Sequence, residues 1–391
     1  MIEGKLSGSK AKLTYGQVGG GPGAFIGPVH RAAIAMNGQA NLVAGSFSNI
    51  YEETLQTAKE LGISDDRTYK TFQEMAEKEA EREDCIDFVS ITVPNHLHFQ
   101  VARVFLEKGI NIVCDKPLCF SIEEAKELVE LAREKGVEFM VTYTYTGYPM
   151  IREARSLVES GELGEIRAIA AEYPQDWLAD PIERTGQQQA SWRTDPRYAG
   201  ISNCVGDIGT HIENLVHFVT KQEIKKLSAR LETFVEGRKL DDNAYILLQY
   251  ESGASGNYWS SQIAVGYENG LKLRVFGSEG SLEWLQEEPN KLYFTKKGKP
   301  KQILTRASDY LHENALSFSR LPAGHPEGYF EAFANLYKAY CDKLIAKKEN
   351  TESKEIIFTD VIDGARGVKF VHDCVESSNK NSAWIDASFN I

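Results

Sequence analysis

Up to about residue 145, short apolar runs alternate with segments whose apolar positions recur at helical spacing. A short apolar run bounded by turn residues is typical of a buried strand, and helical spacing is typical of a helix packed on one face. Strands are predicted at residues 13–18, 41–47, 87–93, 111–114 and 138–143. Helices are predicted at residues 29–37, 51–61, 97–108 and 122–135. Ser121 and Glu124 open the last of these helices as a capping box. The alternation predicts right-handed crossovers and a doubly wound parallel sheet.

The pattern changes after Tyr173. Pro, Gly, Asp and Gln dominate the stretch to Gly206, which predicts a long ordered loop followed by a helix that begins near Asp207. Strands without intervening helices are then predicted at residues 243–250, 256–265, 272–276, 281–284 and 291–295, and helices near 329–346 and 359–376. We therefore expect an α/β domain at 1–145 and an α+β domain at 146–391, built on an open, mostly antiparallel sheet.

Length and charge narrow the possible functions. A chain of 391 residues suggests two domains, and its net charge of −12 argues against nucleic acid or an anionic membrane as the main partner. The polar N-terminus and the lack of any run of about 18 apolar residues predict neither a signal peptide nor a membrane span. Six cysteines without a C-x-x-C pair are typical of reduced thiols in a cytoplasmic protein, with no metal site.

A strand, a glycine cluster and a helix follow one another between Tyr15 and Arg31. Gly19 and Gly21 would permit a tight turn and the close approach of a pyrophosphate to backbone N–H groups at the start of the helix. The spacing departs from G-x-G-x-x-G, because the next glycine able to pack the helix is Gly27. A turn without a ligand is the alternative. The glycine cluster stands at the first strand–helix junction of the chain, and this position favours a dinucleotide site and hence a Rossmann domain.

The end of the second predicted strand bears on the choice of cofactor. An acid at this position would bind the ribose 2′-hydroxyl of NAD, and an arginine would favour NADP. Ser46, Phe47 and Ser48 stand there and provide neither signal. The lack of a basic residue favours NAD and leaves NADP open.

Two further motifs follow the ends of predicted strands, where ligands bind in doubly wound sheets. The first is TVPNHLH, from Thr92 to His98, in which Pro94 ends the strand and Asn95 is expected to cap the next helix. The second is Asp115–Lys116–Pro117, which would place an ammonium group at the cofactor crevice. Taken alone, the first motif is equally compatible with a plain strand–helix turn, and for the second a plain surface turn would be favoured.

Asp207 and His211 lie four residues apart in GDIGTHIEN and would share one face of a helix. A histidine can take or return a proton near neutral pH, and the carboxylate could orient a substrate hydroxyl. The alternative is an aspartate that caps the helix beside a packed histidine. The spacing also suits a metal, but no third ligand motif supports one.

Together the four motifs resemble those of the glucose–fructose oxidoreductase / inositol dehydrogenase / rhizopine catabolism (Gfo/Idh/MocA) family, over nearly the whole chain. The family motifs are a glycine-rich loop, T-P-N-x-x-H, E-K-P and D-x-G-x-H, in that order. Asp115 here replaces the usual glutamate of E-K-P. The extended loop with Ala24, Phe25 and Ile26 resembles a branch acting on sugars, anhydrosugars and inositols.

The resemblance implies hydride transfer between NAD(P) and a secondary hydroxyl of a polyhydroxylated ring. Lys116, Asp207 and His211 would form the catalytic group, with His211 as general acid and base. Residues of the strand ends and loops would bind the cofactor: Gly19, Gly21, Ala24, Phe25, Ile26, Ser48, Thr92, Pro94, Asn95, His98, Asp115 and Lys116. A homodimer or homotetramer is expected, formed through one face of the C-terminal sheet.

Substrate contacts are expected from Lys116, Asp207 and His211 and from the Pro- and Gln-rich loop and its flanks. The further candidates are Asp176, Trp177, Trp192, Arg193 and His325. Ordinary packing would explain each of these almost as well. Two other functions remain open: an NAD-dependent glycosidase that oxidises its substrate transiently, and a nucleotide-sensing regulator without turnover. Retention of the catalytic group argues against the regulator.

Overall fold

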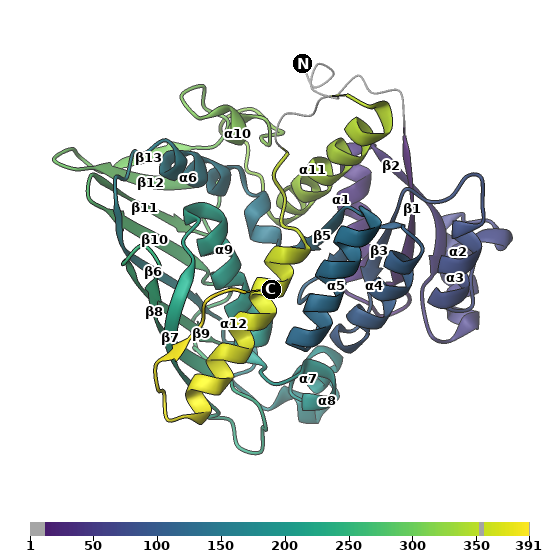
Figure 1. Ribbon diagram of the computed structural model, residues 1–391, viewed down its shortest axis with the longest axis horizontal. Helices are drawn as coiled ribbons and strands as arrows, with labels where there is room; N and C mark the ends of the chain where they lie inside the picture. The colour runs from purple at the N-terminus through teal and green to yellow at the C-terminus, as the bar shows by residue number, and fades with distance from the viewer. Residues whose placement is uncertain (1–11, 352–355, 391) are drawn as a thin grey trace. The chain divides into compact units, whose positions relative to one another are not determined.

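The computed structural model describes residues 12–351 and 356–390, which form two compact units (Figure 1). The first unit comprises residues up to 119 together with 123–144 and 329–364. The second comprises residues 120–122, 145–328 and 365 onward. The prediction that the chain lacks a signal peptide falls on residues 1–11, which lie outside the described part. Among the described residues, no helix is long and apolar enough to cross a membrane.

The first unit is built on a five-stranded parallel sheet with the order β2-β1-β3-β4-β5. Its strands are β1 (Leu13–Gly19), β2 (Ala40–Ser46), β3 (Phe88–Thr92), β4 (Asn111–Asp115) and β5 (Phe139–Thr142). The five strands predicted for this region are all present, and every pairing is parallel. The predicted doubly wound parallel sheet is therefore confirmed.

The connections between these strands contain α1 (Ile26–Asn37), α2 (Tyr51–Leu61), the 3-10 turn η1 (Asp65–Arg67), α3 (Phe72–Ala80), α4 (His98–Glu107) and α5 (Ile122–Lys135). Helix α1 begins three residues earlier than predicted. Pro28 lies in its first turn, where a missing N–H costs no hydrogen bond. The sequence prediction lacks α3, although Thr71 accepts a hydrogen bond from the Glu74 N–H in a T-x-x-E box.

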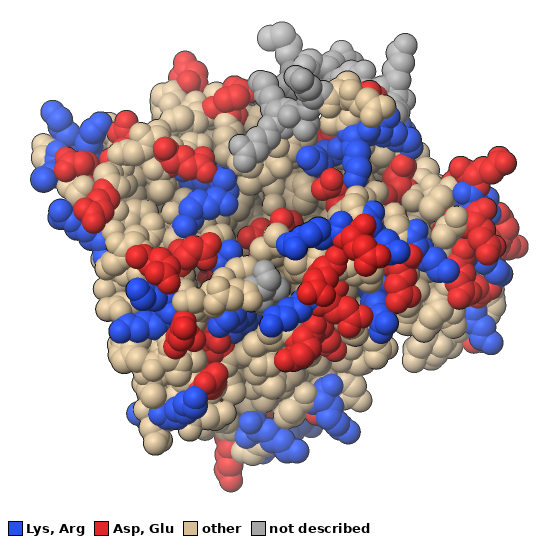
Figure 2. All heavy atoms as spheres, viewed as in Figure 1, with Lys and Arg blue, Asp and Glu red and all other residues tan. Residues whose placement is uncertain are grey.

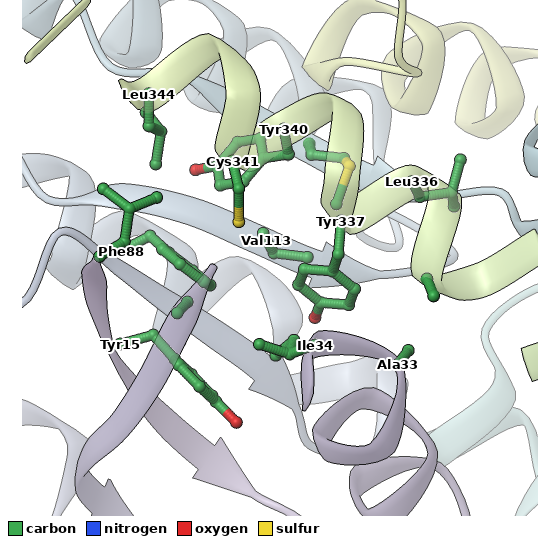
Figure 3. Close-up of a cluster of buried hydrophobic side chains, with 14 of the residues drawn as sticks. Tyr15, Ala33, Ile34, Phe88, Val113, Leu336, Tyr337, Tyr340, Cys341 and Leu344 are labelled. Carbon is green, nitrogen blue, oxygen red and sulfur yellow. The ribbon is translucent and has the colours of Figure 1, made fainter. Parts of the chain in front are cut away.

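Helix α11 (Tyr329–Glu349) belongs to the first unit, whereas the sequence places it in a domain at 146–391. Its apolar face forms one core with α1 and with residues of β1, β3, β4 and β5. Figure 3 shows side chains of α11 above Ala33 and Ile34 of α1. An apolar stripe marks a core-facing helix but does not say which sheet the helix covers, so sequence spacing leaves this assignment undetermined.

The second unit contains a nine-stranded sheet with the order β13-β12-β11-β10-β6-β9-β8-β7-β14. Its strands are β6 (Ile166–Pro174), β7 (Ile224–Glu232), β8 (Asn243–Tyr250), β9 (Ser255–Ser261), β10 (Lys272–Gly277), β11 (Gly280–Leu285), β12 (Lys291–Lys296), β13 (Gln302–Thr305) and β14 (Ile385–Asp386). All neighbours are antiparallel except β6 and β9. The sequence prediction lacks β6, β7, β13 and β14, and it extends β9 too far, to residue 265.

Helices α6 (Pro149–Glu159), α9 (Thr210–Thr220) and α12 (Val361–Asn379) lie on one face of this sheet (Figure 1). The predicted loop from 173 to 206 is ordered and contains short helical turns: η4 (Ile182–Thr185), α7 (Gln188–Arg193) and α8 (Pro196–Ala199). The remaining short elements are η2 (Asn95–Leu97), η3 (Thr144–Gly147), η5 (Val205–Gly209) and α10 (Glu313–Leu316).

Charges of both signs are mixed on the face of the first unit that Figure 2 shows. Acidic side chains gather over α5, α2 and α3, with lysines and arginines between them. Repulsion from such a surface would oppose a nucleic acid backbone there.

Candidate active site

The glycine loop follows β1 and leads directly into α1. Gly19 and Gly20 have φ angles of 83° and 77°, in the left-handed region that favours glycine. A Cβ on Gly27 would lie 2.4 Å from the Gly20 Cα, so Gly27 is the glycine that packs the helix against the loop, as predicted. A Cβ on Gly21 would lie 2.8 Å from the Phe47 carbonyl oxygen. The three successive glycines Gly19, Gly20 and Gly21 leave the backbone ahead of the α1 N-terminus without side chains, which fits the pyrophosphate of a dinucleotide.

Two polar side chains of the first motif, to which the sequence analysis assigns no role, hold this loop in place. Gln17 of β1 is fully buried, and its Nε2 donates to Thr92 Oγ1 at 3.0 Å and to the Gly27 carbonyl at 3.4 Å. Arg31 of α1 donates at 3.0 Å to both Gln17 Oε1 and the Gly20 carbonyl. The conformation of the loop is thus tied to β1, β3 and α1 at once.

The end of β2 carries a carboxylate that the sequence analysis does not identify. Ser48 Oγ donates to Glu53 Oε2 at 2.6 Å, and Glu53 lies in the first turn of α2. The Phe47 side chain is buried with Ala58 and Ile63, so only its backbone faces the glycine loop. An acid therefore stands at the ribose-selecting end of β2 after all, supplied by the helix rather than by the strand.

His98 connects the motif that follows β3 with the motif that follows β4. The side chain is fully buried, with Nδ1 2.6 Å from the Pro117 carbonyl oxygen and Nε2 3.0 Å from the Val93 carbonyl oxygen. A direct hydrogen bond from His98 to a cofactor would require one of these contacts to break. The structure thus gives His98 a bracing role and leaves its predicted cofactor contact unsupported.

The predicted cap at Asn95 is wrong. Asn95 begins the 3-10 turn η2, whereas α4 begins at His98 with Leu97 at its N-cap position. Neither Pro94, before η2, nor Leu97 provides a side-chain cap. The extra turn separates Asn95 from the helix, which a strand–turn–helix pattern does not reveal.

Asp115 and Lys116 end β4, where both side chains are half-buried. Thr142 Oγ1 donates to Asp115 Oδ1 at 2.7 Å, and His30 Nε2 lies 3.9 Å from the same oxygen. Burial raises the pKa of Asp115, but His30, Lys116 and Thr142 outweigh it and lower that pKa to about 2. The carboxylate is therefore ionised throughout the physiological range.

In the second unit, Asp207 lies in the π-helical turn η5, directly before α9. It does not cap α9, whose N-cap is Gly209 without a side-chain bond. Gln262 Nε2 instead donates to Asp207 Oδ2 at 2.9 Å, and Arg193 Nε lies 3.3 Å from the same oxygen. The capping alternative is thus excluded, and the turn places the carboxylate next to a guanidinium.

A buried network fixes the start of this turn. Both carboxylate oxygens of Asp241 accept hydrogen bonds, from the Ser202 hydroxyl and from the N–H groups of Asn203 and Val205, at 3.0–3.1 Å. The fully buried Gln262 connects this network to the site, because its Oε1 accepts from Asn203 Nδ2 at 2.7 Å. Burial raises the pKa of Asp241, and these donors oppose the rise.

His211 lies in the first turn of α9 and is 7% exposed. Its ring meets Tyr145 edge-on, with centroids 4.9 Å apart, and lies 6.2 Å from the Tyr173 ring. The two tyrosine hydroxyls are hydrogen-bonded to each other, and Tyr173 donates to Asn269 at 2.7 Å. These rings restrict the imidazole to a narrow range of orientations, which an acid–base group requires.

The loop candidates divide into two groups. Arg193 stacks on Trp192, with its guanidinium carbon 4.1 Å from the ring centroid, and lies 5.7 Å from the Trp177 ring centroid. These three therefore lie together beside Asp207. Asp176 accepts a bond from the Gly266 N–H at 3.2 Å, and His325 is exposed in the segment between α10 and α11. The substrate roles of all five stay predictions.

The catalytic group expected from the sequence is divided between the units. Lys116 belongs to the first unit, and Asp207 and His211 to the second. The structure brings Asp207 and His211 together on η5 and α9, and the meeting of Lys116 with them stays a prediction. Among the described residues, no group of three or more His, Cys, Asp or Glu could hold a metal ion.

A parallel sheet with a glycine loop before α1, followed by a mostly antiparallel domain, defines the class of two-domain nucleotide-dependent oxidoreductases. Residues 14–143 match the model of the oxidoreductase family with the NAD-binding Rossmann fold, and residues 151–283 match the GFO/IDH/MocA C-terminal domain. The chain belongs to the Gfo/Idh/MocA oxidoreductase family, and its cofactor class is NAD.

Known relatives agree over long stretches. An uncharacterized oxidoreductase of Bacillus subtilis, YfiI, is 35% identical and covers 99% of both chains. The crystal structure of an inositol dehydrogenase homolog from Azotobacter vinelandii, complexed with NADH and myo-inositol, has a TM-score of 0.89 and 38% identity, and covers 96% of this chain and 98% of that one. Levoglucosan dehydrogenase of Pseudarthrobacter phenanthrenivorans is 29% identical over 53% of this chain and 57% of its own.

Proposed function

We propose that this oxidoreductase is an NAD-dependent dehydrogenase that oxidises a secondary hydroxyl of an inositol, a sugar or an anhydrosugar. The observation that carries the proposal is the arrangement of Asp207 and His211 on adjoining turns, with the carboxylate held by Gln262 and Arg193. The full-length likeness to an inositol dehydrogenase homolog supports a polyol ring as substrate.

Each residue of the proposed catalytic group has a distinct task. When bound, NAD accepts the hydride that leaves the carbinol carbon. The hydroxyl must lose its proton as the hydride leaves, and His211 would take that proton. The Lys116 ammonium would stabilise the negative charge that develops on the oxygen. Asp207 would orient a hydroxyl of the substrate, since Gln262 and Arg193 keep its carboxylate in one place.

Asp115 and the glycine loop would hold the cofactor. Gly19, Gly21 and the first turn of α1 would receive the pyrophosphate, and the Asp115 carboxylate would face the nicotinamide ribose. Glu53, held by Ser48, would bind the adenosine ribose hydroxyls and repel a 2′-phosphate. This carboxylate strengthens the preference for NAD over NADP.

The loop that contains α7 would receive the substrate. Trp192 and Trp177 present ring faces beside Arg193, and sugars and cyclitols stack their C–H faces on aromatic rings while guanidinium groups bond their hydroxyls. The position of this cluster beside Asp207 supports its assignment to the substrate site.

A substrate panel tests the proposal. Inositols, aldoses, levoglucosan and aryl glycosides are incubated with NAD or NADP, and reduced nicotinamide is followed by absorbance. We expect stoichiometric NADH with at least one polyol, formed at least about 10²-fold more slowly by His211→Ala. Glycoside cleavage without net NADH would identify a transient oxidation instead. Tight NAD binding without turnover of any compound would indicate a regulator.

We also propose a homodimer or homotetramer that forms through the open face of the nine-stranded sheet. Tyr245, Leu247, Phe276 and Ile303 are each more than two-fifths exposed on its strands. Tyr245 stacks on Trp259 there, with centroids 6.2 Å apart. Sedimentation should show an oligomer that Leu247→Glu dissociates, and a wild-type monomer would contradict the proposal.

The compartment is proposed to be the cytoplasm. Cys85 is half-buried, the other five cysteines are buried, and none forms a disulfide. Burial raises the pKa of the Cys114 and Cys204 thiols, which keeps them protonated and poorly reactive. Fractionation of the source cells with an antibody to the protein would test this location.

A further inference from the structure

Three polar side chains meet in the apolar core of the first unit, beneath Asp115. His30 of α1 and Tyr337 of α11 are fully buried, and His30 Nδ1 lies 2.6 Å from the Tyr337 hydroxyl. Ser90 of β3 completes a triangle, 3.1 Å from that hydroxyl and 3.3 Å from His30 Nδ1. The hydrogen bonds offset the free-energy cost of burying these three polar side chains. Apolar side chains could fill the same part of the core without that cost.

The other nitrogen of His30 faces the cofactor side of the sheet. Nε2 is buried, lacks a hydrogen-bond partner among the residues the structure describes, and lies 3.9 Å from Asp115 Oδ1. Thr142 and Lys116 are the other groups that bear on this carboxylate. A shift of about 1 Å would bring Nε2 and Oδ1 to hydrogen-bond distance.

The Tyr337 hydroxyl determines where the imidazole carries its proton. A neutral imidazole has one N–H and one lone pair. When Tyr337 donates to Nδ1, the N–H is on Nε2 and points at Asp115. When the ring is protonated, both nitrogens donate and the attraction to the carboxylate grows. In both of these states Nε2 presents a proton to Asp115, whereas the tautomer with its N–H on Nδ1 would turn a lone pair toward the carboxylate and is disfavoured by repulsion.

We propose that Tyr337 and His30 are positioning residues: Tyr337 orients the His30 ring, and His30 in turn fixes the orientation of the Asp115 carboxylate for the cofactor. The inference rests on the proposed function, because the task of Asp115 toward the nicotinamide ribose belongs to it. Helix α11, from the C-terminal part of the chain, thereby contributes to cofactor affinity through Asp115.

The same helix provides a matched control. Tyr340 is also fully buried, and its hydroxyl donates to the Glu138 carbonyl at 2.9 Å. Glu138 directly precedes β5, so Tyr340 bonds at the amino end of the sheet, whereas Asp115 ends β4 at the opposite edge. Figure 3 shows both tyrosines projecting from α11.

The experiment compares Tyr337→Phe with Tyr340→Phe, using calorimetric titration of NAD without substrate and the melting temperature of each variant. Tyr337→Phe removes the contacts of its hydroxyl with His30 and Ser90, and Tyr340→Phe removes the bond to Glu138, so both variants are expected to melt at a lower temperature. Only Tyr337→Phe should weaken NAD binding, by roughly three- to tenfold. Equal NAD affinity in the two variants would overturn the proposal. Ser90→Ala allows the same comparison should Tyr337→Phe not fold.

A double-mutant cycle separates positioning from a general structural effect. In an Asp115→Asn background, Tyr337→Phe should change NAD affinity by less than about twofold, because residue 115 no longer carries a carboxylate for His30 to orient. An undiminished effect in that background would contradict the proposal. If the wild-type protein does not bind NAD, it is the proposed function that fails.

Discussion

The glycine loop of the first unit and the Asp207 turn of the second unit are built differently, and each depends on one fully buried glutamine. In the first unit, Gln17 lies within β1 and holds a glycine loop that begins two residues later. In the second, Gln262 follows β9 and holds Asp207, which lies 55 residues earlier in the chain. Glycine backbone geometry and Gln17 therefore shape the proposed cofactor loop, while Gln262, which is distant in sequence, holds the proposed catalytic carboxylate. Substitutions that disturb the glycine loop should therefore change NAD affinity, and substitutions that disturb the Asp207 turn should change kcat.

The largest effect is expected from the catalytic group itself. His211→Ala should lower kcat by about 10²- to 10⁴-fold, since general acid–base catalysis contributes on that scale. Lys116→Met should lose a comparable amount, and the double variant should lose less than the summed free energies because both residues act on one oxygen. Steady-state kinetics and NAD titration on the same samples check this. Near-normal kcat in His211→Ala would remove His211 from the chemistry.

The two units should also differ in sensitivity to acid. Burial lowers the pKa of His217, at the end of α9, to about 4. The unfolded chain, with a histidine pKa near 6.5, therefore gains a proton first, and the stability contributed by neutral His217 is lost as the pH falls from about 6.5 to about 4. Asp115 in the first unit has a lowered pKa of about 2, so its contribution is lost only between about pH 4 and pH 2.

All five tryptophans lie in the second unit, so their fluorescence reports its unfolding. Between pH 7 and 4.5, the wild type should lose about 2 kcal/mol more unfolding free energy than His217→Gln. The buried Asp373, whose pKa burial raises to about 6, changes stability in the opposite direction, and the comparison of variants cancels its effect. Parallel pH curves for the two proteins would contradict the assignment.

Substitutions of Gln17 and Gln262 test whether the glycine loop and the Asp207 turn have separate tasks. Gln17→Leu should weaken NAD binding about tenfold while kcat at saturating NAD changes little, because the loop loses its brace. Gln262→Leu should lower kcat about tenfold and leave NAD affinity unchanged, because Asp207 loses a donor. Calorimetry and kinetics on both variants decide. If both variants affect the same quantity, the division of tasks is wrong.

The smallest effect concerns the choice of cofactor. Glu53→Gln removes the charge that would repel a 2′-phosphate and keeps the size of the side chain. The ratio of kcat/KM for NAD over NADP should fall roughly three- to tenfold. Glu52→Gln, on the exposed neighbouring position, serves as the control. An unchanged ratio in Glu53→Gln would show that Glu53 does not select the cofactor.

Sequence patterns could predict the strands of the first unit and the four motifs because these depend on local periodicity and turn chemistry. Gly27 was identifiable as the packing glycine from its place after the loop. Glu53 was not, since its approach to Ser48 depends on how α2 leaves the strand. Gln17 was visible only as a polar residue inside an apolar run, and Gln262 and Asp241 gave no signal of their contact with the turn that carries Asp207. Long-range pairing of side chains also explains why α11 could not be assigned to its sheet.

The proposed function requires that a hydride passes from a carbinol carbon of the substrate to NAD. The most direct measurement uses the polyol identified by the panel, deuterated at its ring carbons, followed by mass spectrometry of the cofactor. We expect reduced cofactor that carries deuterium at C4, formed at least about 10²-fold more slowly by His211→Ala. Reduced cofactor without deuterium, or substrate converted while the cofactor ends fully oxidised, would contradict it.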